Sequence, residues 1–218
     1  LVGSEMCIRD SSVGGLVYID FADPKNPIVE KVDYDFVHSG YTLCTIDSGA
    51  DHADLTDEYA AMPVEMKAVA AFFGKEVLHD VDEAAFYRHI AEVRKVTGDR
   101  AVLRAIHFFN ENRRVKSQVR ALKDGDFDAF LHFVNASGMA SWTLLQNVTP
   151  AGYIQKQDMA FTIALCQQLL EGEGAVRIHG GGFAGCVQAL MPSEYFPKYK
   201  SEMEAAFGLG SCRALKLG

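Results

Sequence analysis

The chain has 218 residues, of which 49% are hydrophobic and 23% charged, ordinary proportions for a globular protein with one sizeable domain. Its formal net charge of −8 excludes non-specific nucleic-acid binding, which needs a basic surface, and no apolar run is long enough to span a membrane. Five scattered cysteines without a CxxC pair predict a reducing compartment, by default the cytoplasm, rather than a disulfide framework.

Residues 1–11, LVGSEMCIRDS, stand apart from the rest of the sequence. They lack a clear periodicity, the apolar core of a signal peptide and a start methionine. The segment resembles translated sequencing-adapter read-through. We therefore predict an artefactual head that is not part of the fold, with protein-like sequence from residue 12 onward.

Three strands are predicted next, at 16–21, 28–36 and 41–47, which suggests an antiparallel sheet. A polar loop then leads into a helix that ends at Gly74. The loop and the helix start hold an acidic group that includes a histidine: Asp51, His52, Asp54, Asp57 and Glu58. Their spacing matches no metal-site pattern, and acidic side chains at a helix start favour the helix dipole, so no metal site is predicted.

The following part is predicted to be mostly helical, with helices at 82–96, 100–123, 126–147, 156–171 and 193–207. Strands are expected at 174–179, 185–191 and 211–217. Asp82 is the expected N-cap of the first of these helices. His107 and Glu111 stand at i and i+4, where their side chains can meet. An acid–base pair is conceivable there, but the pattern favours an exposed structural pair.

A glycine-rich loop, His179-Gly180-Gly181-Gly182-Phe183-Ala184-Gly185, separates two of the apolar strands. Without Cβ atoms the backbone can bend sharply or present several N–H groups to an anion. The loop matches neither GxxxxGK[ST] nor GxGxxG, so the residues alone leave both a hairpin turn and a ligand loop open. Residues 177–186, RIHGGGFAGC, resemble the third signature motif of the galactokinases, which are GHMP small-molecule kinases.

A second segment, residues 40–66, also resembles galactokinases, where a loop carrying a histidine leads to a helical tyrosine. Tyr59 holds that tyrosine's place, and the resemblance implies that it binds the sugar as a substrate-binding residue. Gly180, Gly181, Gly182 and Gly185 would form the wall of the sugar and phosphate pocket. Gly138 and Leu145 replace residues usual in the family, which leaves the sugar contacts of that segment open.

The resemblance covers the C-terminal half of a galactokinase only and implies an α+β fold. Residues 38–218 would form the ferredoxin-like GHMP kinase C-terminal domain, an antiparallel sheet with helices on one face. Residues 12–37 would be strands left over from the N-terminal domain. The missing N-terminal half would be the intramolecular partner of this chain.

The implied reaction transfers the γ-phosphoryl group of ATP to the anomeric hydroxyl of galactose, with Mg²⁺ on the phosphates. The resemblance places the catalytic Asp, its Arg and the phosphate loop outside this sequence, so the chain alone is predicted to be inactive and to hold no catalytic residue. Two alternatives stay open: another GHMP kinase, acting for example on N-acetylgalactosamine, and a non-enzymatic sugar sensor.

Overall fold

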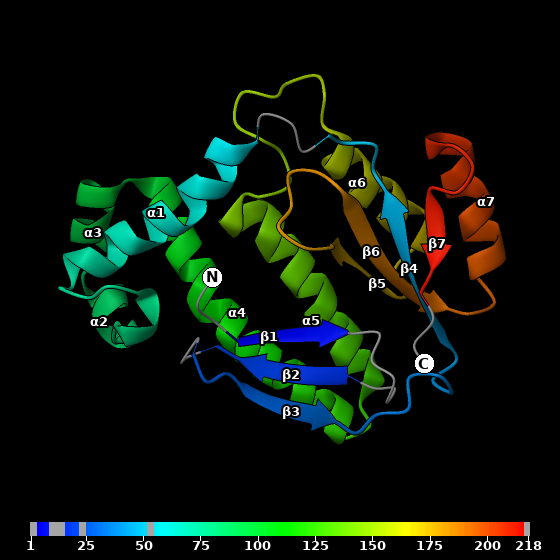
Figure 1. Cartoon of the computed structure of the whole chain (residues 1–218), viewed down its shortest axis with the longest axis horizontal. Coiled ribbons are helices and arrows are strands. Elements are labelled where there is room, and N and C mark those ends of the chain that lie inside the picture. Colours follow the sequence, from blue (N-terminus) through cyan, green and yellow to red (C-terminus); the bar gives the residue numbers. More distant parts are fainter. Residues whose placement is uncertain (1–3, 9–15, 22–24, 52–54, 216–218) are drawn as a thin grey trace.

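The computed structural model describes residues 4–8, 16–21, 25–51 and 55–215, the first of these ranges by its backbone alone. Two antiparallel sheets lie on either side of a pair of central helices (Figure 1). The α+β class predicted from the sequence is confirmed. Within the described ranges, no helix is both long enough and apolar enough to cross a membrane.

The helical elements follow the predicted order. They are α1 (Thr56–Phe72), η1 (Leu78–Asp80), α2 (Glu83–Arg88), α3 (Ile90–Thr97), α4 (Asp99–Lys123), α5 (Phe127–Ala140), the π-helical turn η2 (Ser141–Leu145), α6 (Asp158–Leu170) and α7 (Phe196–Phe207). Asp82 caps α2 as predicted, because its carboxylate accepts from the main-chain N–H groups of Ala84 and Ala85.

The larger sheet has the strand order β5-β6-β4-β7. Its strands are β4 (Tyr41–Asp47), β5 (Ala175–Ile178), β6 (Cys186–Pro192) and β7 (Cys212–Ala214), each antiparallel to its neighbours. Side chains alternate between its two faces. Ile46 and Val187 pack with residues of α6 and α7 in one buried cluster, whereas Leu43 and Leu190 share another cluster with α5. The sheet is therefore covered by helices on one face and approached by α5 on the other.

The smaller sheet has the order β1-β2-β3, with β1 (Ser4–Ile8), β2 (Leu16–Asp20) and β3 (Ile28–Val32). Its buried residues Leu16 and Val32 belong to the same cluster as Leu122 of α4 and Phe130 of α5. The predicted strand 28–36 ends early at Val32. The chain turns there because Phe36 is buried against Phe127 at the start of α5.

The segment Ser4–Ile8 differs from the expectation that residues 1–11 lie outside the fold. Its backbone pairs with β2 in the register Ser4↔Asp20 to Ile8↔Leu16. Strand pairing uses main-chain N–H and C=O groups, so a strand edge can accept an extended segment of any sequence. Residues 1–3 and 9–11 lie outside the described residues, and the origin of the head stays a prediction.

Two predicted helices are interrupted. The helix expected at 82–96 bends at His89, between α2 and α3, and the bend lets Phe86 and Val93 enter the same core. The helix expected at 126–147 ends at Ala140 and widens into η2. Gln146 then adopts a left-handed backbone conformation with φ 56°. This second interruption brings the following residues to the glycine loop.

Candidate functional site

The glycine loop joins β5 to β6 at the end of the larger sheet that faces α1 (Figure 1). Gly180, Gly182 and Gly185 have φ values of +83°, +86° and +88°, which residues with a Cβ rarely adopt. At Gly182 space also demands glycine, since a Cβ would lie 2.1 Å from the main-chain oxygen of Asn147. Gly185 is held from the other side, where its carbonyl accepts from the N–H and the hydroxyl of Ser48.

Tyr59 of α1 binds directly to this loop. Its hydroxyl donates to the carbonyl of Gly182 over 2.6 Å, and its ring stands edge-on to Phe183 with the centroids 5.3 Å apart. A Cβ on Gly181 would lie 3.0 Å from Cε1 of Tyr59. Burial raises the pKa of Tyr59, so the phenol stays a hydrogen-bond donor at neutral pH. The structure thus brings together the tyrosine and two of the glycines that the sequence analysis selected, Gly181 and Gly182.

Asn147 is a further loop contact, which the sequence analysis did not identify. It is 2% exposed, and its side-chain Nδ2 donates to the carbonyl of Gly181 over 2.9 Å. Its main-chain oxygen accepts from the N–H of Phe183 over 2.5 Å. The sequence signal is faint: an asparagine between Gln146 and Val148, directly after a residue that leaves the helix.

Arg104 of α4 supports the segment that carries Asn147. It is 0% exposed, and its Nε donates to the carbonyl of Leu145 over 3.0 Å. Its Nη1 donates to Glu65 of α1 over 2.9 Å, and Arg100 shares the same carboxylate. Burial lowers the pKa of Arg104, an effect that the neighbouring Glu65 opposes. A buried cation held between α1 and η2 therefore fixes the end of the turn beside the loop.

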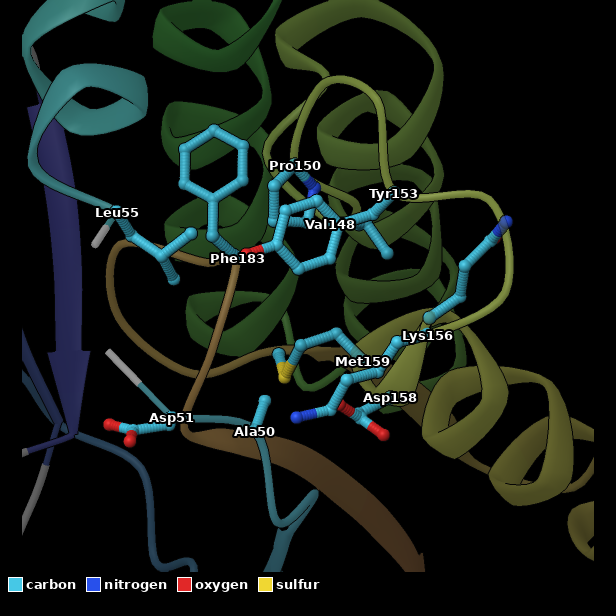
Figure 2. Close-up of a pocket in the computed structure, with 11 residues that line it drawn as sticks. Ala50, Asp51, Leu55, Val148, Pro150, Tyr153, Lys156, Asp158, Met159 and Phe183 are labelled. Carbon is cyan, nitrogen blue, oxygen red and sulfur yellow. The ribbon is translucent and has the colours of Figure 1, made fainter. Parts of the chain in front are cut away.

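A pocket of about 150 Å³ lies next to the loop (Figure 2). Its lining comes from the segments before α1 and after η2, from the start of α6 and from the loop: Ala50, Asp51, Leu55, Val148, Pro150, Tyr153, Lys156, Gln157, Asp158, Met159 and Phe183. Phe183 is the loop's contribution to this lining. The predicted role of the four glycines as the wall of a sugar pocket stays a prediction.

The acidic group before and within α1 has separate partners. Asp57 and Glu58 lie in the first turn of α1, and Glu58 accepts from the N–H of Ala151 over 2.8 Å. His52 and Asp54 lie outside the described residues. Among the residues that the structure describes, no group of three or more His, Cys, Asp or Glu side chains could hold a metal ion.

The pair His107 and Glu111 was expected to be exposed, and that expectation is wrong for His107, which is 8% exposed. The face of α4 that carries it is covered by α5 and η2. Glu111 accepts from the hydroxyl of Ser137 over 2.5 Å and forms an ion pair with Arg114. Both residues serve the packing of α4 on α5, away from the glycine loop.

No family model matches the chain. The galactokinase of Glaesserella parasuis serovar 5 is 30% identical to it over 158 residues, which make up 72% of this chain and 39% of that protein. The chain thus spans about two fifths of the length of the curated relatives it matches.

Two solved structures share the fold. The galactokinase of Lactococcus lactis, solved with galactose, covers 94% of this chain with a TM-score of 0.69 and 18% identity, and the chain covers 51% of it. The mevalonate kinase of L. major, solved with R-mevalonate, covers 92% with a TM-score of 0.54 and 12% identity, and the chain covers 48% of it. At these identities the likeness concerns the fold alone.

Proposed function

Because the chain is homologous to galactokinases, we propose that it forms the glycine-loop side of the sugar site in a GHMP sugar kinase. The contact of Tyr59 with Gly182 carries this proposal. The two motifs that resemble galactokinases lie more than a hundred residues apart in the sequence, and they meet through the hydrogen bonds of Tyr59 to Gly182 and of Ser48 to Gly185. A motif match at either place alone would predict a turn or a packed tyrosine as readily.

The proposed reaction of the whole kinase is transfer of the ATP γ-phosphoryl group to the anomeric hydroxyl of galactose. Phosphoryl transfer depends on positioning and on stabilising charge more than on covalent chemistry by the protein. The loop can position sugar hydroxyls through its N–H groups, and Tyr59, whose O–H is donated to Gly182, can hold the loop for that task. The described residues hold no cluster that could bind a metal ion, and the sequence has no GxxxxGK[ST] loop. We therefore assign no residue of this chain to the binding of Mg²⁺ or ATP.

The domain division is part of the proposal. Residues 38–218 would form the C-terminal domain, and residues 12–37 would belong to an N-terminal domain that completes the kinase. Ile28 and Val29 of β3 are 64% and 62% exposed, which supports a partner surface on the smaller sheet. The buried unpaired cysteines Cys44, Cys166 and Cys212 support a reducing compartment such as the cytoplasm.

Two measurements on the chain test this function. Galactose titrated into the labelled chain should shift the amide signals of Gly180–Gly182 more than those of Gly208 and Gly210, which lie beyond α7. A coupled assay with galactose and Mg-ATP should give no turnover above background. Sustained turnover would contradict the predicted inactivity of the chain. Amide signals of the loop that do not shift at millimolar galactose would contradict the proposed sugar site.

The same titration separates the alternatives. A loop that responds to N-acetylgalactosamine and not to galactose would indicate another sugar kinase. The sensor alternative concerns the whole protein and predicts sugar binding without turnover when this chain is joined to the remaining part.

A further inference from the structure

We propose that Asn147 is a positioning residue of this site, which fixes the peptide between Gly181 and Gly182 and with it the course of the glycine loop. The inference rests on the proposed function for the identity of the ligand. It rests on geometry for the role of the asparagine. Asn147 is not among the residues lining the neighbouring pocket and acts through the loop alone.

The orientation of the Asn147 amide follows from its neighbour. The side-chain nitrogen must face the Gly181 carbonyl at 2.9 Å, since two facing oxygens would repel each other. The peptide bonds of the described residues are trans, and in a trans peptide the C=O and the next N–H point in opposite directions. With the Gly181 carbonyl turned toward Asn147, the Gly182 N–H points away from it.

A second contact prevents the peptide from turning over. The main-chain oxygen of Asn147 accepts from Phe183, so the same residue binds the loop on both sides of Gly182. Tyr59 holds the Gly182 carbonyl over 2.6 Å. The carbonyls of Gly181 and Gly182 are thus both engaged by protein groups, which fixes this part of the loop. Gly182 itself is buried, so the loop backbone that a sugar or phosphate oxygen can reach lies at the exposed Gly180 and Gly181.

The Oδ1 atom of Asn147 indicates that this residue serves to position the loop and not to stabilise the fold. Its Oδ1 is buried and accepts no hydrogen bond from the residues that the structure describes. A buried acceptor without a partner destabilises a fold by about 1–3 kcal/mol. Arg104 and the left-handed Gln146 nevertheless hold Asn147 in this place.

The test compares Asn147→Asp with the native chain by amide spectroscopy across the pH range 4–8. The ionised carboxylate of this variant lacks the donor and repels the Gly181 carbonyl, so the loop amides should move away from their native positions. A protonated carboxyl carries an O–H that can donate to Gly181, and burial raises the pKa of a carboxyl. The native loop signals should therefore return as the pH falls. The native chain, which has the same His179 beside the loop, is recorded over the same pH range, and only a change beyond that of the native chain counts as this return.

Asn147→Ala should lose the loop order at every pH, with roughly tenfold faster hydrogen exchange at the Phe183 amide. Asn135→Ala is the matched control, since Asn135 also binds main chain, but at the opposite end of β5 from the loop. Loop signals that stay native in Asn147→Ala, or that show no pH-dependent return in Asn147→Asp, would overturn the positioning role. If the Asn147 variants behave as expected but galactose does not shift the loop signals of the native chain, the proposed function is contradicted and the positioning role is not.

Discussion

The α5–β5 junction and the junction of Asn147 with the glycine loop each use an asparagine to bind main-chain groups, but the two asparagines have different roles. At the α5–β5 junction, Asn135 donates to the carbonyl of Gly174 and accepts from the N–H of Val176, each over 2.9 Å. At the loop junction, Asn147 donates to the loop but leaves its Oδ1 without a partner among the described residues. The first amide is fully used to close the edge of a strand. The Asn147 amide keeps its oxygen without a hydrogen-bond partner among the described residues.

Each junction also has a glycine at the point of closest approach. A Cβ on Gly138 would lie 2.5 Å from the carbonyl oxygen of Val176, and a Cβ on Gly182 would meet Asn147. Gly138 is helical, whereas Gly182 has a left-handed backbone. The comparison indicates that the α5–β5 junction holds the fold together and that the loop junction fixes the shape of the glycine loop. Substitutions at the first should therefore affect global stability, and those at the second should affect the loop.

The largest effect is expected for Gly138→Ala. Within a helix this change normally stabilises by up to about 1 kcal/mol. Here the new methyl group meets a strand backbone that cannot yield, so we expect a loss of about 3 kcal/mol in the free energy of unfolding. Denaturant unfolding measures it. As a control, Met139→Ala at the exposed neighbouring position should change the free energy of unfolding by no more than about 0.5 kcal/mol. A Gly138→Ala variant as stable as the native chain would show that the close contact with Val176 does not matter for stability.

Gly182→Ala should follow, at about 2–3 kcal/mol, because it adds an overlap with Asn147 to the strain of a left-handed alanine. Gly180→Ala is the matched control: its φ is +83°, and a Cβ there meets nothing within 4 Å. The difference between the two variants isolates the loop junction from backbone strain. Equal losses in thermal unfolding would show that the Asn147 contact contributes nothing.

Much of this arrangement could be predicted from the sequence, and the reasons are local. Apolar, β-branched runs with bounding glycine or proline residues located β4, β5 and β6 to within one or two residues. The tyrosine and the glycine loop were selected by motif. Their contact is confirmed, whereas their roles toward a sugar stay predictions.

The remainder depends on contacts between distant segments. The periodicity of 126–147 is helical throughout, whereas the observed end of the helix is held by a distant contact, the bond from Arg104 to Leu145. The contact between Asn147 and the loop depends on this turn, which places Asn147 beside Gly182, and the sequence alone does not predict it. The burial of His107 likewise follows from the packing of α5 on α4.

Asn135→Ala is expected to destabilise by about 2 kcal/mol, since it leaves the N–H of Val176 and the carbonyl of Gly174 without their partner at a strand edge. The same truncation at Asn147 should cost less, because that side chain makes one hydrogen bond and already holds an unsatisfied oxygen. Calorimetric unfolding of the two variants ranks them. The reverse order would break the division between a fold junction and a loop junction.

The packing of α4 on α5 should also respond to pH through His107. Burial lowers the pKa of His107, with Arg114 and Arg177 adding to the effect and Glu111 opposing it. The unfolded chain therefore takes up this proton first as the pH falls below about 6.5. Stability that is present above this pH is lost below it, until the folded form is protonated too. His107→Gln should flatten this part of the stability–pH curve, and an unchanged slope would contradict a buried neutral histidine.

The smallest effect is expected for Tyr59→Phe, which removes the hydroxyl that binds Gly182 and keeps the ring against Phe183. One hydrogen bond of this kind contributes about 1 kcal/mol, so unfolding should shift little. The exposed pocket residue Tyr153, changed to Phe, is the control and should shift less still. Galactose affinity separates two roles of the phenol. A loss of affinity near the stability loss would mean that Tyr59 acts by holding the loop, and a loss tenfold larger would mean that its hydroxyl also binds the sugar.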